Sequence, residues 1–152
     1  MFNKKIIYDI IKWLNIRLFK KGVYRMDSQF RIVVAGCRNF TDYEKVKKRL
    51  EIELEVLGSR LVIVSGGAAG ADSLGERFAK EHNLEIERFP ADWKKYGKAA
   101  GPIRNDQMAQ VADMVIAFWD GKSKGTENML RMANKYGIKM DVQLVRIDKE
   151  IK

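Results

Sequence analysis

The chain has few of the residues from which disulfides, zinc sites and histidine-dependent active sites are built. Its 152 residues include one cysteine, Cys37, one histidine, His82, and two prolines. A single cysteine cannot form an internal disulfide, and a structural zinc site takes about four cysteine or histidine ligands. His82 lies near the expected end of a helix, where it is better placed to cap the helix than to catalyse a reaction. We therefore expect no metal site and no Ser-His catalytic pair.

Long hydrophobic runs are also missing. Every apolar run is interrupted by Lys, Arg, Asp or Glu within about a dozen positions, whereas a membrane span needs roughly 18 apolar residues. Near the start there is no apolar segment followed by the small-residue cleavage site of a signal peptide. Together with the lone cysteine, these absences predict a soluble protein of the reducing cytoplasm.

Basic residues are in excess, and the excess is concentrated at the N-terminus. The net charge is +9, but residues 1–25 carry seven basic residues and one acidic residue, against 22 and 19 in the rest of the chain. The smaller excess after residue 25 is ordinary for a globular domain and is no basic footprint for nucleic acid. The charge pattern therefore argues against nucleic acid as the partner.

Residues 1–25 form an extension whose apolar residues have helical spacing. They are Ile6, Ile7, Ile10, Ile11, Leu14 and Leu18. This spacing predicts an amphipathic helix, with Lys12 and Arg17 on its polar side. Three uses stay open: packing on the domain or on a second copy in a homo-oligomer, lying at a membrane surface with Trp13 among the headgroups, or serving as a loosely attached tail.

Residues 26–152 form the second expected unit, in which short β-rich runs alternate with helical ones. We expect strands at 31–35, 61–64, 84–89, 114–118 and 139–145, and helices at 42–57, 72–82, 101–111 and 126–136. Such alternation implies right-handed βαβ crossovers, and the apolar runs IVVA, LVIV and MVIAF are typical of strands buried on both faces. The fold prediction is α/β: a Rossmann-like, three-layer α/β/α domain with a mostly parallel sheet of about five strands.

In such a sheet, ligands bind beyond the carboxyl ends of the strands. The first expected strand is followed by Gly36, Cys37 and Arg38, and then by Thr41 or Asp42 as the cap of the next helix. The guanidinium of Arg38 offers a fork of donors suited to phosphate. Gly36, Cys37 and Arg38 are candidate ligand-binding residues, and Cys37 is expected to be a small buried residue of this loop.

The second strand is followed by a glycine-rich loop. Its candidate ligand-binding residues are Ser65, Gly66, Gly67, Ala68, Gly70, Ala71 and Asp72. Their small size leaves backbone N–H groups and a helix N-terminus open to an anion. The loop has neither the Gly-Lys-Ser/Thr ending of a Walker P-loop nor a proper G-x-G-x-x-G fingerprint. Because Asp72 would repel a phosphate, we expect it to cap the helix or to hold a ribose hydroxyl or a backbone group.

Two later segments complete the predicted site. Residues 89–105 are expected to form a long loop over the ligand, in which Trp93 stacks on a base or fills a hydrophobic edge. Arg104 and Asn105 would start a helix there. The loop at 120–126 again precedes a helix and adds Ser123, Gly125 and Thr126. Two loops of this kind facing one cleft predict a phosphate site.

The segments GCRNFTDYE, VSGGAAGAD, FPADWKKYGKAAGPIRN and GKSKGT, taken together, resemble the YspA-like branch of the SLOG superfamily. This superfamily includes relatives of YpsA, the Lonely Guy phosphoribohydrolases and the DNA-processing protein DprA. The resemblance runs from about Phe30 to Val142. It implies a Rossmann-like sheet with a pocket for a nucleotide or a nucleotide-derived signal. The pocket would be formed by Gly36, Arg38, the Ser65–Asp72 loop, Arg104, Asn105, Ser123, Gly125 and Thr126.

The same resemblance raises the question of catalysis. Lonely Guy enzymes look similar through Arg104–Met108 and Ala112-Asp113, and their next motif, Gly-Gly-x-Gly-Thr-x-x-Glu, ends in the catalytic carboxylate. Here Met129 stands at that position and Glu127 comes two residues early, a displacement of about 200° around a helix. Whether the protein is an enzyme stays open, with Glu127 and Asp92 as the candidate catalytic residues.

The predicted function is binding or sensing of a nucleotide or nucleotide-derived ligand, such as an ADP-ribose-like or cyclic nucleotide signal, with no other cofactor. The first alternative is a nucleotide N-glycosidase of the phosphoribohydrolase type. The second is DprA-like binding of single-stranded DNA.

Overall fold

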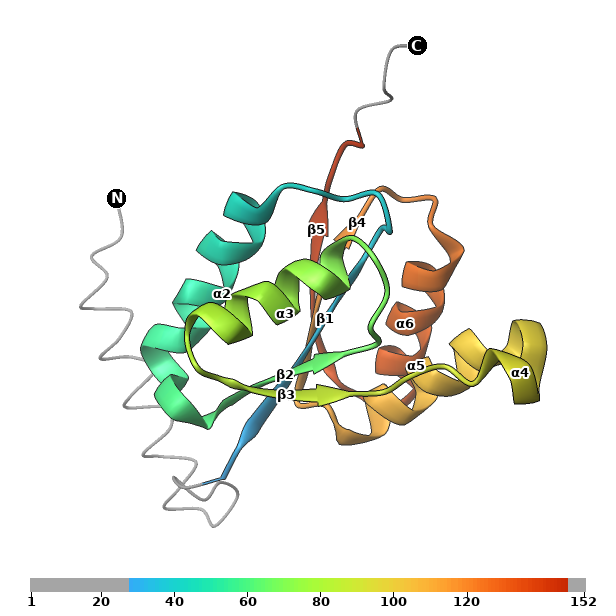
Figure 1. The fold of residues 1–152 in the computed structure, drawn as a ribbon, viewed down its shortest axis with the longest axis horizontal. Coiled ribbons are helices and arrows are strands. Elements are labelled where there is room, and N and C mark those ends of the chain that lie inside the picture. Colours follow the sequence, from blue (N-terminus) through green and yellow to red (C-terminus); the bar gives the residue numbers. More distant parts are fainter. Residues whose placement is uncertain (1–27, 148–152) are drawn as a thin grey trace.

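The computed structural model describes residues 28–147, which form a five-stranded sheet with helices on both faces. The strands are β1 (Phe30–Gly36), β2 (Leu61–Ser65), β3 (Glu85–Arg88), β4 (Met114–Trp119) and β5 (Lys139–Leu144). Their order across the sheet is β3-β2-β1-β4-β5, and every neighbouring pair is parallel (Figure 1). The α/β class, the number of strands and the parallel sheet are thereby confirmed.

Five helices connect the strands. They are α2 (Tyr43–Leu57), α3 (Ala71–Glu81), α4 (Trp93–Tyr96), α5 (Ala100–Val111) and α6 (Lys124–Lys135). Helices α2 and α3 cover one face of the sheet, while α5 and α6 cover the other (Figure 1). This arrangement is the expected three-layer sandwich.

Alternate residues of the central strand β1 enter two different cores. Ile32 belongs to the hydrophobic cluster that includes Leu50 of α2 and Phe78 of α3. Its neighbour Val33 belongs to the cluster that includes Met108 of α5 and Met129 of α6. Successive side chains of a strand point to opposite faces, so a strand covered on both sides needs an unbroken apolar run. The run IVVA meets that need.

Capping residues mark the start of α2 and the end of α3. Asp42 caps α2 by accepting a hydrogen bond from the backbone N–H of Lys45, as one of the two expected capping residues. His82 ends α3 and its Nδ1 lies 2.9 Å from the carbonyl oxygen of Phe78, so its expected role as a helix cap is confirmed.

The segment after β3 differs from the prediction. We expected a long loop over residues 89–105, but residues 93–99 form helix α4 and a 3-10 turn, and α5 follows without a break. Asp92 starts α4 by accepting a hydrogen bond from the N–H of Lys95. As a result, Arg104 and Asn105 lie in the second turn of α5 and do not start it. The loop prediction was wrong for residues 93–99, because the Gly and Lys residues of the segment suggested a loop more strongly than the capping aspartate suggested a helix. The helix expected at 101–111 is present as α5.

The expected N-terminal helix lies outside the described residues, and so does the boundary at residue 25. Within residues 28–147, none of the helices has the length and apolar character needed to cross a membrane.

The topology places a crevice beside β1. The chain runs outward from β1 through β2 to β3 and then returns to the other side of β1 with β4. Loops that follow β1 and β4 therefore diverge at this switch point and leave room for a ligand.

Candidate functional site

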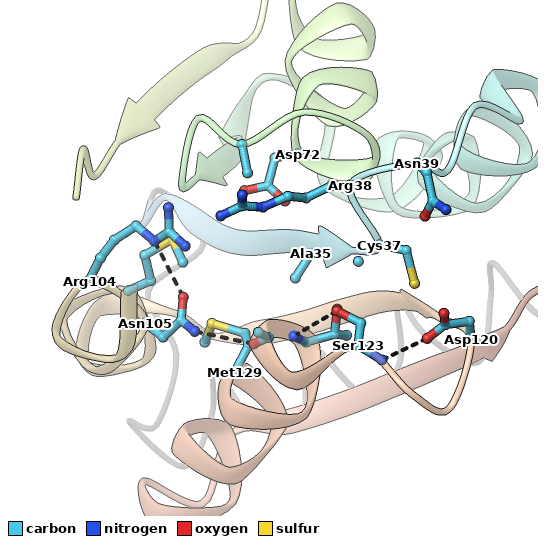
Figure 2. A pocket seen from close by; sticks show the side chains of 15 residues that line it. Ala35, Cys37, Arg38, Asn39, Asp72, Arg104, Asn105, Asp120, Ser123 and Met129 are labelled. Atoms are coloured by element: carbon cyan, nitrogen blue, oxygen red, sulfur yellow. Dashed lines mark hydrogen bonds between the residues drawn. The ribbon is translucent and has the colours of Figure 1, made fainter. Parts of the chain in front are cut away.

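A cavity of about 330 Å³ opens at the carboxyl ends of β1 and β4; we call it the main cavity. Figure 2 shows it bounded by the loop after β1, the start of α3, the middle of α5 and the start of α6. It is lined by Ala35, Gly36, Cys37, Arg38, Asn39, Ala68, Asp72, Arg104, Asn105, Met108, Asp120, Ser123, Gly125, Thr126 and Met129. Residues from both expected phosphate loops thus face a single space.

Two arginines from different elements converge at this cavity. Arg38 extends from the loop after β1 and is exposed, while Arg104 extends from α5 and is half-buried; the two side chains point toward one another (Figure 2). Nη1 of Arg104 donates a hydrogen bond to the carbonyl oxygen of Gly66 at 2.9 Å. Within the described part of the chain, the guanidinium of Arg38 has no ion pair or hydrogen bond. Its donors are therefore available to a ligand.

The electrostatics of Arg104 reflect this convergence. Burial lowers its pKa, the carboxylate of Asp72 opposes that change, and the charge of Arg38 lowers the pKa further. Like charges that approach each other in a partly buried site are unfavourable until an anion neutralises them. The pair Arg38 and Arg104 is thus suited to hold one.

Asp72 is a buried carboxylate beside these arginines, with 7% of its surface exposed. Burial raises its pKa to about 6, although Arg104 and nearby backbone N–H groups act in the opposite direction. Its Oδ2 accepts a hydrogen bond from the N–H of Gly66 at 3.2 Å. Of the roles considered for Asp72, the helix cap is wrong, because Gly70 occupies that position, and the backbone contact is present.

The start of α6 forms the opposite wall. Oγ of Ser123 caps the helix by accepting from the N–H of Thr126, and it also accepts from Oγ1 of Thr126 at 3.0 Å. Asp120 accepts hydrogen bonds from the N–H groups of Lys122 and Ser123, which lower its pKa. This network fixes a helix N-terminus, with Gly125 and Thr126 at the cavity, where its partial positive charge attracts anions.

Asn105 joins the two helices on this side of the sheet. It is buried, and its Nδ2 donates to the carbonyl oxygen of Gly125 at 3.3 Å and to Oδ1 of Asn128 at 2.9 Å. These bonds hold α5 against the first turn of α6. Asn105 thereby positions the loop that carries Ser123, besides lining the cavity itself.

Only part of the glycine-rich loop lines the main cavity. Ala68 and Asp72 line the main cavity, as do Gly36 and Cys37 of the first loop. Gly70 and Ala71 do not: the N–H of Ala71 donates to the carbonyl oxygen of Cys37 at 3.4 Å, so this part of the loop docks on the loop after β1. Ser65 is fully buried, and its Oγ accepts from the N–H of Gly67 at 3.0 Å. Ser65, Gly70 and Ala71 therefore shape the loop and lie outside the cavity.

A second space, which we call the outer hollow, lies next to the main cavity and measures about 460 Å³. Its lining comprises Arg38, Gly66, Gly67, Ala68, Ala69, Arg88, Pro90, Ala91, Trp93 and Arg104. Trp93, a predicted ligand-binding residue, lies here and not in the main cavity, with 51% of its surface exposed. Gly66 and Gly67, which connect β2 to α3 in the glycine-rich loop, contribute to this lining.

Comparison with known proteins now identifies the family. The family model for "YspA, cpYpsA-related SLOG family" matches residues 30–96. The Gene 61 protein of Mycobacterium phage D29 is 39% identical over 114 residues, which cover 71% of this chain and 91% of that protein. This chain belongs to the YspA, cpYpsA-related SLOG family. The resemblance found in the sequence motifs is confirmed.

Solved structures show the same fold. DprA from Streptococcus pneumoniae superimposes with a TM-score of 0.63 at 20% identity, covering 80% of this chain and 52% of that one. DprA from Helicobacter pylori gives a TM-score of 0.56 at 24% identity, covering 82% of this chain and 69% of that one. The SLOG-family chain therefore spans about half the length of the S. pneumoniae protein.

Neither expected catalytic carboxylate of this SLOG-family protein lines the main cavity or the outer hollow. Asp92 caps α4. Glu127 pairs with Lys124 at 3.0 Å and lines a separate hollow beside β5, whereas Met129 faces the main cavity. The carboxylates at the main cavity are instead those of Asp72 and Asp120. Among residues 28–147, no three His, Cys, Asp or Glu residues are grouped to hold a metal ion.

Several lining residues were missed from the sequence. Asn39 and Asp120 follow β1 and β4 closely, so the rule that ligands gather at strand ends could have included them. Met108 and Met129 are apolar and buried on the faces of α5 and α6 that pack on the sheet. Nothing in the helical pattern separates these two methionines from ordinary core residues.

Proposed function

We propose that this SLOG-family protein binds a nucleotide or a nucleotide-derived ligand through its phosphate at the main cavity. The observation that carries the proposal is the convergence of Arg38 and Arg104, without ion-pair partners among the described residues, beside the N-terminus of α6. Guanidinium groups and helix N-termini are both well suited to holding phosphate. Membership of the SLOG family supports a function in binding nucleotides or nucleic acid.

The remaining surface of the main cavity suits the rest of such a ligand. Asn39 and Ser123 offer amide and hydroxyl groups for ribose or base edges, and Met108 and Met129 offer apolar contact. An ADP-ribose-like compound and a cyclic nucleotide are the ligand types that we propose to test first.

The test is calorimetric titration of the 152-residue protein with AMP, cyclic AMP and ADP-ribose, preceded by mass spectrometry of small molecules that co-purify. We expect Arg38→Ala to weaken binding by roughly 10- to 100-fold, because a hydrogen bond to a charged group contributes about 1.5–3 kcal/mol.

Arg131→Ala is the matched control, because Arg131 is an exposed arginine of α6 outside the main cavity and the outer hollow. It removes the same charge and should leave the affinity unchanged. Equal losses in both variants would reduce the proposal to non-specific attraction by the net charge, and unchanged affinity in Arg38→Ala would refute it.

A second candidate is binding of single-stranded DNA. The H. pylori DprA structure that shares this fold is described by its single-stranded DNA binding mode. The exposed ring of Trp93 beside Arg88 and Arg38 is an arrangement on which a base could stack. This candidate predicts that oligothymidylate binds more tightly than a mononucleotide and that its affinity falls steeply with salt, because binding releases counterions.

A further inference from the structure

The main cavity does not end at its two arginines. Arg38, Ala68 and Arg104 line both the main cavity and the outer hollow. The guanidinium groups therefore stand at the border between two spaces. A phosphate held by both arginines would have room for an organic group on either side.

The outer hollow has the lining of a site for a flat ring. Trp93 and Pro90 are exposed residues of its lining, and at the exposed Gly67 no atom lies within 4 Å of the position that a Cβ would take. Nε and Nη2 of Arg88 are bonded to the carboxylate of Glu76 at 2.9–3.2 Å, so its charge is already neutralised. Apart from the two border arginines, which the first phosphate would occupy, the lining of the outer hollow carries no unpaired charge. Its exposed aromatic ring therefore favours stacking of a base over binding of a second anion.

The charge at the border also limits the type of phosphate. Arg38 and Arg104 bring two positive charges, and Asp72 brings a negative one. When Asp72 is ionised, one net positive charge remains at this border; the other carboxylate of the main cavity, Asp120, lies at its far end, away from the two guanidinium groups (Figure 2). A terminal phosphate carries about −1.5 to −2 at neutral pH. A phosphate esterified on both sides carries a single charge, which matches the border.

We propose that the ligand is a compound with an internal phosphate, such as a dinucleotide, which spans both spaces. Its phosphate lies between Arg38 and Arg104, one nucleoside occupies the main cavity, and the second base stacks on Trp93 in the outer hollow. This inference rests on the proposed function, because it needs the phosphate to bind at the two arginines. It goes further in assigning the outer hollow as a base subsite and in excluding a nucleoside monophosphate as the best ligand.

The experiment compares two ligands by calorimetry on the full chain. They are the dinucleoside monophosphate ApA, which has an internal phosphate and a second base, and AMP, which has neither. We expect ApA to bind more tightly than AMP. Trp93→Ala should weaken ApA binding roughly 10-fold, in the range found for stacking of one base, and should change the AMP affinity less than about twofold. Trp93→Phe should restore most of the loss.

The outcomes separate the two proposals. If AMP binds as tightly as ApA, and Trp93→Ala changes neither affinity while Arg38→Ala weakens both ligands, the base subsite is refuted and the proposed function stands. If Arg38→Ala changes no affinity, both are refuted. An affinity that rises steadily from ApA to longer oligonucleotides, with a dependence on Trp93, would overturn the small-molecule ligand in favour of single-stranded DNA.

Discussion

A Cβ on Gly70 would lie 2.1 Å from the carbonyl oxygen of Cys37. The two residues belong to the loops that follow β2 and β1, and the glycine lets the backbones of these loops touch. Gly70 also has a φ of 78°, in the left-handed region that side chains avoid. This contact holds the start of α3 against the first loop of the site, next to Arg38.

The first prediction follows from that contact. Gly70→Ala meets both the clash and the unfavourable φ, and should lower the free energy of unfolding by about 3 kcal/mol or more. Gly121→Ala is the control, because Gly121 has a φ of 76° but no atom within 4 Å of its would-be Cβ. It should cost only about 1–2 kcal/mol. Denaturant titration of both variants measures the difference, and equal losses would show that the close approach is unimportant.

The second prediction concerns pH and stability. The pKa of Asp72 is about 6 in the folded chain, above its usual value of 3.8. The folded state therefore holds this proton more tightly, so its contribution to stability is present below about pH 4 and is lost as pH rises through 6, by roughly 3 kcal/mol. Asp72→Asn should remove this loss. Thermal unfolding between pH 4 and 7 checks it, and parallel pH profiles for the two proteins would contradict it.

The third prediction concerns pH and ligand affinity. Protonation of Asp72 below about pH 6 removes a negative charge beside Arg104, so an anionic ligand should bind more tightly at low pH. ApA is the suitable probe, since its phosphate keeps one charge over this range. We expect the affinity of the wild type for ApA to rise several-fold between pH 7.5 and 5, on the order of the tenfold change that one pKa unit represents. The affinity of Asp72→Asn should not change over this range. A flat wild-type profile would show that Asp72 does not act on the ligand.

The fourth prediction concerns Asn105. Removing its side-chain amide in Asn105→Ala breaks two part-buried hydrogen bonds, to the carbonyl oxygen of Gly125 and to Oδ1 of Asn128. The expected loss of stability is about 1–3 kcal/mol. Gln110→Ala removes an exposed amide that bonds to Asp106 at 2.7 Å and should cost much less. Melting temperatures of the two variants compare a bond that joins α5 to α6 with one on the surface.

The fifth prediction addresses the hydrolase alternative. Because Glu127 lies outside the main cavity and the outer hollow, Glu127→Ala should keep the wild-type affinity for the ligand. Asp92 caps the short helix that carries Trp93, so Asp92→Ala is assayed for release of base alone. Incubation of the wild type with AMP, followed by chromatography, should yield no free adenine beyond that of a protein-free control. Base release that disappears in Glu127→Ala would restore the N-glycosidase as the function.

Much of the fold was determined by local sequence. The apolar runs that form β1, β2 and β4 can be buried only on both faces, and capping residues such as Asp42 fix where helices begin. The helical period alone predicts that Glu127 points away from the direction taken by Met129, the position at which Lonely Guy enzymes have their catalytic carboxylate. The strand-end loops could likewise be located, since each follows a strand directly.

Only the tertiary structure decided how those loops meet. Arg38 and Arg104 are far apart in sequence, and their convergence depends on which strands are neighbours at the switch point. The division of the glycine-rich loop is decided by Gly70 packing on Cys37, a contact between loops of separate strands. The raised pKa of Asp72 depends on burial, which no single segment determines. Local sequence thus fixes backbone conformation through nearby sterics and hydrogen bonds, whereas the charge and shape of the site depend on distances between segments that only the assembled sheet sets.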